Sequence, residues 1–175
     1  MIPGELVGLR AREPEDAALF HAWNSDPETM LWWDRTYPPV PVPLQEERLR
    51  TVPSPSFDEP SFTITDLATG TAIGWCGLHH VSAEHRHAEL GVMIGDAAYR
   101  GRGYGSDATR TLCRFAFDRM NLARVTLVVF AANAAARRAY EKAGFVEEGV
   151  QRRAAWKRGE WLDLVHMAVF TETLR

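Results

Sequence analysis

The sequence predicts an α/β (α+β) fold in which helices flank a mixed, mostly antiparallel sheet. Strand-like runs joined by short turns predict antiparallel hairpins at residues 61–81 and 150–170. Another apolar run, His87–Ile94, is followed by a helical pattern and then by the β-branched run Arg124–Phe130. That order makes a right-handed crossover and therefore a parallel pair. At 175 residues we expect a single domain over residues 1–175.

The N-terminal part is predicted to form a short strand and short helices. Residues 6–12 alternate as a strand, and Pro14 with the acids after it suits a first helical turn. Asp26-Pro27 ends that helix, and a second short helix follows over residues 30–33.

Residues 34–60 hold seven of the ten prolines, interrupted by one short helix at 44–50. Loops this long are usually functional or disordered. Because Trp32, Trp33 and Tyr37 lie at one end of this segment, we interpret it as a lid over an acceptor site. A plain surface excursion is the alternative.

The centre of the chain is a strand that runs into a glycine-rich turn. Residues 87–94 alternate as a half-buried strand, and helical spacing of apolar residues begins at Ser106 and ends near Asn121. Between them lies Arg100-Gly-Arg-Gly-Tyr-Gly105. Glycines at a helix start allow backbone N–H groups to hold an anion, and phosphate suits them best. A simple tight turn is the alternative.

Two better-known phosphate loops do not match this segment. A Walker loop needs Gly-Lys-Ser/Thr, and the chain has no such tripeptide. A dinucleotide-binding turn needs Gly or Ala at Ser106 and an acidic residue after the next strand, where Ala131-Ala132-Asn133 stands instead.

The C-terminal part continues the pattern of alternating elements. Residues 124–130 suit a strand covered on both faces. Asn133 caps a helix over 134–143 that Gly144 ends. The final hairpin turns about residues 157–159.

The net charge of −3 is unevenly distributed along the chain. Residues 1–96 carry six basic and 15 acidic side chains, or −9, while residues 97–175 carry 14 and eight, or +6. The basic part begins at the glycine turn, which suits a polyanion there, and the acidic part suits a cationic co-substrate. A chance distribution over a solvated surface is the alternative. With no membrane-length apolar run and no signal-peptide core, we expect a cytoplasmic location and no membrane partner.

Two segments together carry a family resemblance. Arg100-x-x-Gly103-x-Gly105, followed by a helix, a strand and Asn133-x₆-Tyr140-Glu-Lys-Ala-Gly-Phe145, resembles the GNAT superfamily of N-acetyltransferases. Smaller details resemble its ribosomal-protein N-terminal (RimJ/RimL-like) branch: Glu89-Leu-Gly91, Phe115-Ala-Phe117, and Asp163 with Met167. The resemblance implies a seven-stranded sheet whose parallel pair is splayed apart at the acetyl-CoA site.

The resemblance implies acetyl-CoA as donor and assigns residues to it. The pyrophosphate would lie on the backbone of the glycine loop: Arg100, Gly101, Arg102, Gly103, Tyr104, Gly105 and Ser106. The pantetheine arm would pair with Val92, Met93 and Ile94. Asn133 would bond the arm, and Arg138 would reach a phosphate. Ala136 stands where many relatives have serine.

Acetyl transfer to an amine needs a base and benefits from an acid. An alkyl amine has a pKa near ~10 and must lose a proton before it attacks, while the thiolate leaving group benefits from a proton donor. Tyr140 is the candidate acid, with a half-buried core aromatic as the alternative. Glu89 is the candidate base, with a solvated strand carboxylate as the alternative. The rivals for the base are four histidines: His79, His80, His85 and His87.

The function predicted from these observations is acetyl transfer from acetyl-CoA to a primary amine by direct attack on the thioester. The acceptor is a small molecule or a protein N-terminus, and it is expected to be cationic. Trp32, Trp33, Tyr37 and Asp163 are the candidate acceptor-site residues. We expect no metal, because no Cys/His cluster has ligand spacing.

Two other classes of function are less well supported. One is a non-catalytic acyl-CoA-binding regulatory module, which Tyr140 and Glu89 argue against. The other is a nucleic-acid binder, which the negative net charge disfavours. The identity of the acceptor, the preference for acetyl over longer acyl groups, and a homodimer are left open.

Overall fold

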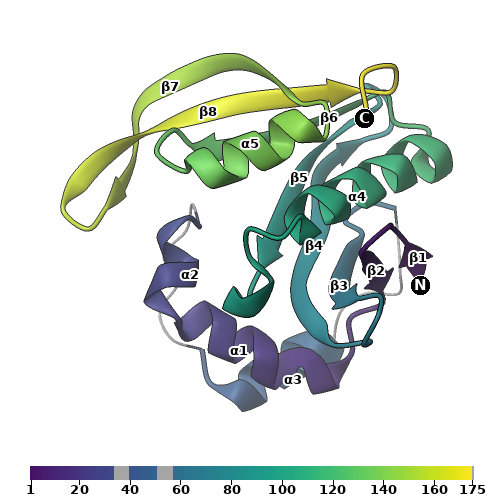
Figure 1. Cartoon of the computed structure of the whole chain (residues 1–175), viewed down its shortest axis with the longest axis vertical. Helices are drawn as coiled ribbons and strands as arrows, with labels where there is room; N and C mark the ends of the chain where they lie inside the picture. Colours follow the sequence, from purple (N-terminus) through teal and green to yellow (C-terminus); the bar gives the residue numbers. More distant parts are fainter. Residues whose placement is uncertain (34–39, 51–56, 175) are drawn as a thin grey trace.

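The computed structural model describes residues 1–33, 40–50 and 57–174, and its centre is one twisted sheet (Figure 1). Within these residues the sheet has eight strands in the order β1-β2-β3-β4-β5-β6-β8-β7. The strands are β1 (Ile2–Pro3), β2 (Val7–Arg10), β3 (Ser61–Asp66), β4 (Ala72–Ser82), β5 (His87–Ile94), β6 (Arg124–Phe130), β7 (Val146–Lys157) and β8 (Glu160–Phe170).

The pairing confirms the mixed sheet that the sequence predicts. β3–β4 and β7–β8 are antiparallel hairpins, and β5 pairs with β6 in parallel. The described sheet has eight strands rather than seven, because the two-residue β1 folds back onto β2. A strand of two residues is too short to show an alternating pattern. β7 also begins at Val146, four residues before the expected start.

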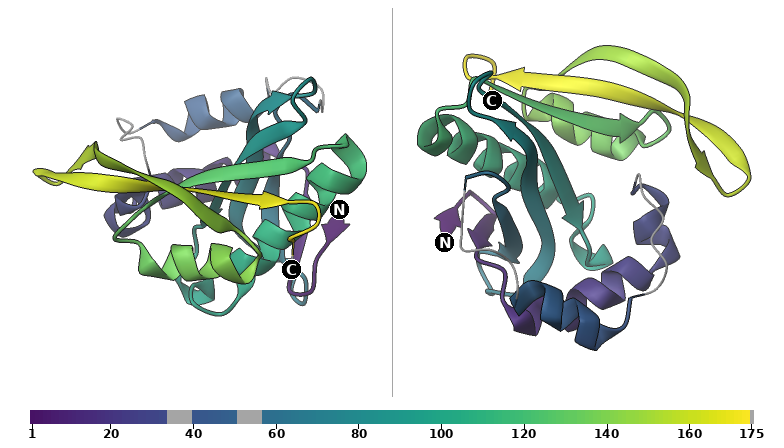
Figure 2. Two further views of the ribbon diagram at one scale, coloured as in Figure 1. Left: turned by 90° about the horizontal axis from the view of Figure 1, so that it is seen from above. Right: turned by 180° about the vertical axis from the view of Figure 1, so that it is seen from behind.

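The helices cover both faces of the sheet (Figure 2). Their bounds are α1 (Ala17–Ser25), α2 (Pro27–Leu31), α3 (Val42–Arg50), α4 (Tyr104–Met120) and α5 (Ala134–Lys142), with 3₁₀ turns at Pro14–Asp16 and Ala97–Tyr99. α4 packs against β2, β4, β5 and β6, and α5 contacts α4. α1 and α3 pack together beside the opposite face. None of the helices in the described ranges is long and apolar enough to cross a membrane.

The alternation within β5 separates two hydrophobic cores. Ala88 and Leu90 are buried in the larger core, beneath α4. Met93 faces the other way and is buried with Phe20 of α1 and Leu49 of α3. Glu89 and Met93 are both odd-numbered, so β5 presents them to the face that α1 and α3 cover.

A buried carboxylate fixes the start of α4. Asp107 is fully buried, and its Oδ2 accepts hydrogen bonds from the backbone N–H groups of Glu5, Leu6 and Val7 at 3.0, 2.7 and 3.0 Å. Three donors satisfy a buried carboxylate that would otherwise be costly. The contact ties the N-terminal segment to the first turn of α4, next to the glycine loop.

Candidate active site

The parallel pair β5–β6 separates after only three residues. His87–Glu89 pair with Arg124–Thr126, whereas the rest of β5 pairs only with β4 and the rest of β6 only with β8. A cleft of about 1850 Å³ opens where the strands diverge. Val92, Met93 and Ile94 line it from the β5 side. The open strand edges leave backbone groups that an extended ligand can pair with.

The glycine loop closes one end of the cleft. Gly101 and Gly103 have φ of 72° and 94°, in the left-handed region that favours glycine. Within the described residues, the N–H groups of residues 101–106 donate to no backbone carbonyl outside α4, and Gly103 provides no side-chain cap for this helix. These donors lie at a helix N-terminus, where partial positive charge accumulates. The loop is therefore suited to phosphate groups.

The two arginine side chains of the loop bind the protein itself. Arg100 donates from Nε to the Ile94 carbonyl at 3.0 Å and from Nη2 to the Gly95 carbonyl at 2.7 Å. Arg102 donates to the Ala98 carbonyl at 3.2 Å. These contacts occupy part of each guanidinium group, and the positive charge of both stays beside the loop. In the structure, the free backbone N–H groups are the donors that this loop offers.

α5 brings three predicted residues to the cleft. Asn133 caps the helix by accepting a hydrogen bond from Ala136 N–H at 3.1 Å. This contact uses only the carbonyl oxygen of Asn133. Arg138 is exposed and lines the cleft. Tyr140 lines it as well, with its ring 5.9 Å from that of Phe145, and burial raises the pKa of Tyr140 to about 12.

Glu89 lines the cleft from β5 and is half-buried. It lies opposite His79 of β4, and its Oε2 is 3.5 Å from Nδ1 of His80. His80 has φ of 50°, at a shift of register between β4 and β5. A bulge of this kind redirects a side chain. His79 and His80 both line the cleft, whereas the other two histidines stack on each other outside its lining.

Aromatic side chains line the side of the cleft near α1 and α2. Trp32 and Trp33 both contribute, as predicted from the sequence. The Trp33 ring lies 5.0 Å from Trp75, which in turn lies 6.4 Å from His79. Sequence reasoning missed Trp75, although its position on β4 opposite Met93 follows once the β4–β5 register is known. Tyr37 lies outside the described residues.

Asp163 is not in the lining of the cleft. Its carboxylate accepts hydrogen bonds from the backbone N–H of Arg153 at 2.8 Å and from the Arg152 side chain at 3.3 Å. Residues 151–155 are where the β7–β8 register shifts. The structure therefore places Asp163 at an irregular part of the hairpin, outside the lining of the cleft.

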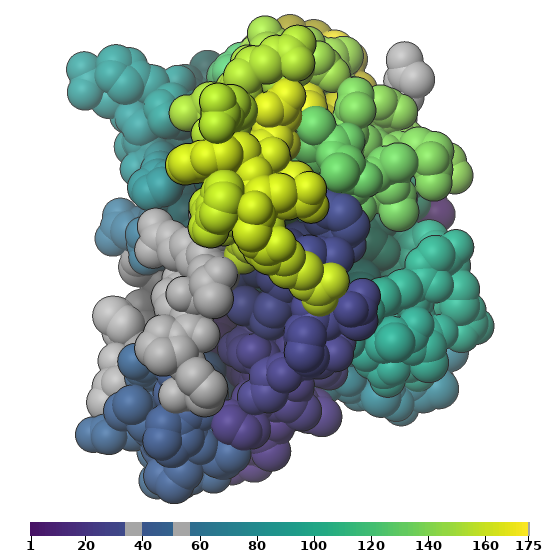
Figure 3. Space-filling view, turned by 90° about the vertical axis from the view of Figure 1, so that its left-hand side faces the viewer, coloured from purple at the N-terminus to yellow at the C-terminus, as the bar shows by residue number. Residues whose placement is uncertain are grey.

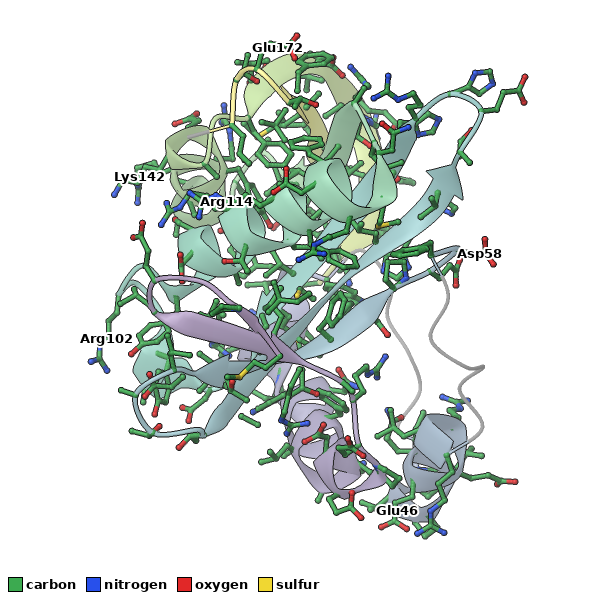
Figure 4. All side chains as sticks on the ribbon, turned by 90° about the vertical axis from the view of Figure 1, so that its right-hand side faces the viewer. Glu46, Asp58, Arg102, Arg114, Lys142 and Glu172 are labelled. Carbon is green, nitrogen blue, oxygen red and sulfur yellow. The ribbon has the colours of Figure 1, made fainter. Side chains whose placement is uncertain are left out.

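Charge along the cleft follows the division seen in the sequence. Acidic lining residues come from the N-terminal half: Glu28, Asp58, Glu59 and Glu89. Apart from Arg12, the Arg and Lys residues of the lining come from the C-terminal half: Arg100, Arg138 and Lys142. Figure 4 shows Arg102, Arg114 and Lys142 on the side that carries the glycine loop, α4 and α5, with Glu46 and Asp58 on the other.

A comparison with protein families identifies the chain. Residues 7–146 match the acetyltransferase (GNAT) domain. The chain belongs to the GNAT acetyltransferase family. It is an acetyl-CoA-dependent N-acetyltransferase, which transfers an acetyl group from acetyl-CoA to an amine.

Similar proteins include other members of this family. The spermidine N(1)-acetyltransferase of Escherichia coli K12 is 26% identical over 94% of this chain and 86% of its own. A crystal structure of spermidine N-acetyltransferase from Vibrio cholerae, in complex with CoA and spermine, has a TM-score of 0.85 at 25% identity, covering 96% and 97% of the two chains. A putative ribosomal N-acetyltransferase, YdaF of Bacillus subtilis, is 32% identical over 59% of this chain and 56% of its own.

The described residues of this acetyltransferase fit its co-substrate. The N–H groups of residues 101–106 suit the pyrophosphate. The edge of β5 at Val92–Ile94 does not pair with β6, and apart from the Ile94 carbonyl, which Arg100 bonds, it suits an arm with amide groups. Among the described residues, no group of three or more His, Cys, Asp or Glu side chains could hold a metal ion.

Proposed function

We propose that this enzyme acetylates a primary amine of a small, cationic, polyamine-like molecule. The observation that carries the proposal is the division of charge along one cleft, with an amide-lined loop and basic residues at the donor end and carboxylates toward the acceptor side. Relatives that align over most of the chain are named spermidine acetyltransferases, and one of their structures contains spermine.

On the acceptor side, aromatic rings and carboxylates offer complementary contacts to an alkylammonium chain. Trp33 and Trp75 form a wall of electron-rich rings, which attract cations over their faces. Glu28 and Glu89 line the same cleft and add negative charge. A chain with several ammonium groups can use both kinds of contact along its length.

The reaction proceeds by direct attack of the amine on the thioester carbonyl. Glu89 removes the proton from the ammonium group, directly or through water, because it is the carboxylate nearest the point where the strands diverge. The open backbone edge of β5 supplies N–H donors for the oxyanion. Tyr140, whose hydroxyl stays protonated because burial raises its pKa to about 12, protonates the thiolate as it leaves.

A second candidate acceptor is the N-terminus of a protein, as in the RimJ/RimL-like branch. It is supported by the likeness to a putative ribosomal N-acetyltransferase, although that likeness covers 59% of the chain. The spermidine acetyltransferases align over nearly all of it, which favours the small cationic amine.

An amine panel tests the proposal, with release of free CoA thiol as the readout. The panel compares spermidine, an alkyl monoamine of similar length and a short peptide with a free N-terminus. We expect the highest kcat/KM for spermidine. A Glu89→Gln variant controls for uncatalysed thioester cleavage and should lose turnover with every amine. Efficient acetylation of the peptide together with no acetylation of spermidine would contradict the proposal and favour a protein N-terminus as the acceptor.

A further inference from the structure

Helix α2 contributes Glu28 and Thr29 to the lining of the cleft, and three other parts of the chain contact α2 or the residue after it. Arg100, just beyond the end of β5, donates a hydrogen bond to Thr29. The Trp32 ring lies 6.1 Å from Phe130, the last residue of β6. Arg158, at the tip of the β7–β8 hairpin, lies 3.2 Å from Glu28. Figure 3 shows this hairpin resting against the part of the chain that forms α1 and α2.

Among the polar contacts of α2, which also include a hydrogen bond from Arg158 to the Pro27 carbonyl at 3.4 Å, the one to Arg100 is shielded from solvent. Thr29 is only 8% exposed, and Arg100 Nη2 donates to its Oγ1 at 2.6 Å. The Thr29 hydroxyl donates in turn to Asp26, the N-cap of α2. Glu28 and Arg158 are 72% and 55% exposed, and ion pairs at such positions add little. Arg100 is therefore the polar anchor of α2.

Arg100 is also the first residue of the glycine loop. Its side chain holds α2, while the free N–H groups that suit the donor phosphates begin at the next residue. α2 carries Glu28 and Thr29 and leads directly into Trp32 and Trp33, all of which line the cleft. Arg100 thus connects the glycine loop to Glu28, Thr29, Trp32 and Trp33. These four residues are called the acceptor wall below.

We propose that Arg100 is a positioning residue that couples the two substrate sites. It holds α2 in place through Thr29, so that a loop ordered by acetyl-CoA also orders the acceptor wall. The inference rests on the proposed function at one point, because it assumes that the acceptor amine binds beside the acceptor wall. Coupling of this kind makes acceptor binding tighter once the donor is bound, and the effect is reciprocal.

Thr29→Val tests the coupling, because valine keeps the shape of the side chain and removes the hydroxyl. We expect the acceptor KM to rise about tenfold, the scale of one hydrogen bond to a charged group. The acetyl-CoA Kd, measured by calorimetry without acceptor, should not weaken, and kcat should be preserved. Thr29→Ser retains the hydroxyl and should restore the acceptor KM.

Thr65→Val is the matched control for loss of a buried hydroxyl. Thr65 is 3% exposed, donates to the Gly8 carbonyl at 3.0 Å and is not part of the cleft lining. The Thr65→Val variant should have a lower free energy of unfolding and an unchanged acceptor KM. The proposal is overturned if Thr65→Val reproduces the acceptor effect, or if Thr29→Val weakens the donor as much as the acceptor.

Hydrogen exchange gives a readout that does not depend on which amine is acetylated. In the wild type and in Thr29→Ser, CoA should slow exchange in a peptide spanning α2 as well as in the glycine loop. In Thr29→Val, CoA should slow exchange in the glycine loop but not in the peptide spanning α2. If CoA protects the loop of the wild type and leaves α2 unchanged, the coupling is wrong even where the amine panel supports a polyamine acceptor.

Discussion

At the scale of single residues, Tyr140 combines a packed ring with a position in the lining of the cleft. The ring contacts Phe145 and packs against the larger core. Burial raises the pKa of the hydroxyl to about 12, so it carries its proton throughout the neutral range. A group in this state can donate a proton to a departing thiolate but cannot accept one from an ammonium group. This protonation state suits the acid role that we propose for Tyr140.

Tyr140→Phe removes the hydroxyl and keeps the ring. We expect kcat to fall by about 10²-fold or more, the usual contribution of acid–base catalysis. The acetyl-CoA Kd and the thermal midpoint should change little, because the ring contacts remain. In the wild type, kcat should show no loss from tyrosine ionisation until the pH approaches the raised pKa of about 12. Equal kcat values for the two proteins would leave Tyr140 with a packing role alone.

At the scale of elements, the turn from β5 into α4 offers backbone groups to the anion site that we predict there. Gly101 and Gly103 have left-handed φ values, and N–H groups without a backbone partner extend from this loop into the first turn of α4. Asp107 holds that turn against the N-terminal segment. We therefore expect phosphate binding at this turn to depend on backbone conformation more than on the loop's arginine side chains.

Two glycines allow a matched test of this element. Gly101 and Gly70 have φ of 72° and 74°, and an added Cβ would meet nothing within 4 Å at either position. Alanine at either site should cost about 1–2 kcal/mol of stability, because left-handed backbone disfavours a side chain. Only Gly101→Ala should raise the acetyl-CoA Kd, measured by calorimetry. Equal donor affinity in the two variants would remove the loop from the binding site.

At the scale of the whole molecule, the charge of the chain is segregated. The −9 of residues 1–96 and the +6 of residues 97–175 correspond to acidic and basic parts of one cleft. A charged cleft raises the local concentration of an oppositely charged ligand and speeds its association. The two substrates should therefore approach under attraction of opposite sign.

Salt tests this long-range attraction. The attraction is screened over about 10 Å at 0.1 M salt, so kcat/KM for a polycationic acceptor should fall as salt rises. The assay needs saturating acetyl-CoA, because donor binding to the basic part weakens with salt as well. A monoamine of similar length is the control and should show a shallower dependence. Parallel slopes for the two amines would mean that aromatic packing, and not charge, selects the acceptor.

Much of the fold could be predicted from local sequence patterns. The alternation over 87–94, the glycine turn and the apolar run over 124–130 each predicted an element whose limits agree closely with β5, the loop and β6. Such patterns work because alternation reports which side of a strand is buried, and glycine reports backbone freedom. The candidate residues Glu89 on β5 and Tyr140 on α5 lie in the lining of the cleft, and their roles stay predictions.

What the sequence could not determine were contacts between distant residues. Thr29 and Arg100 are 71 positions apart, and only packing of α2 against the end of β5 brings them together. Asp163 looked like an acceptor-site residue, yet the irregular hairpin uses its carboxylate for Arg153. By itself, the sequence determined the elements and the glycine turn before α4, because these depend on neighbouring residues. The tertiary structure decided the divergence of β5 from β6 and the partner of each charged group, because these depend on how whole elements pack.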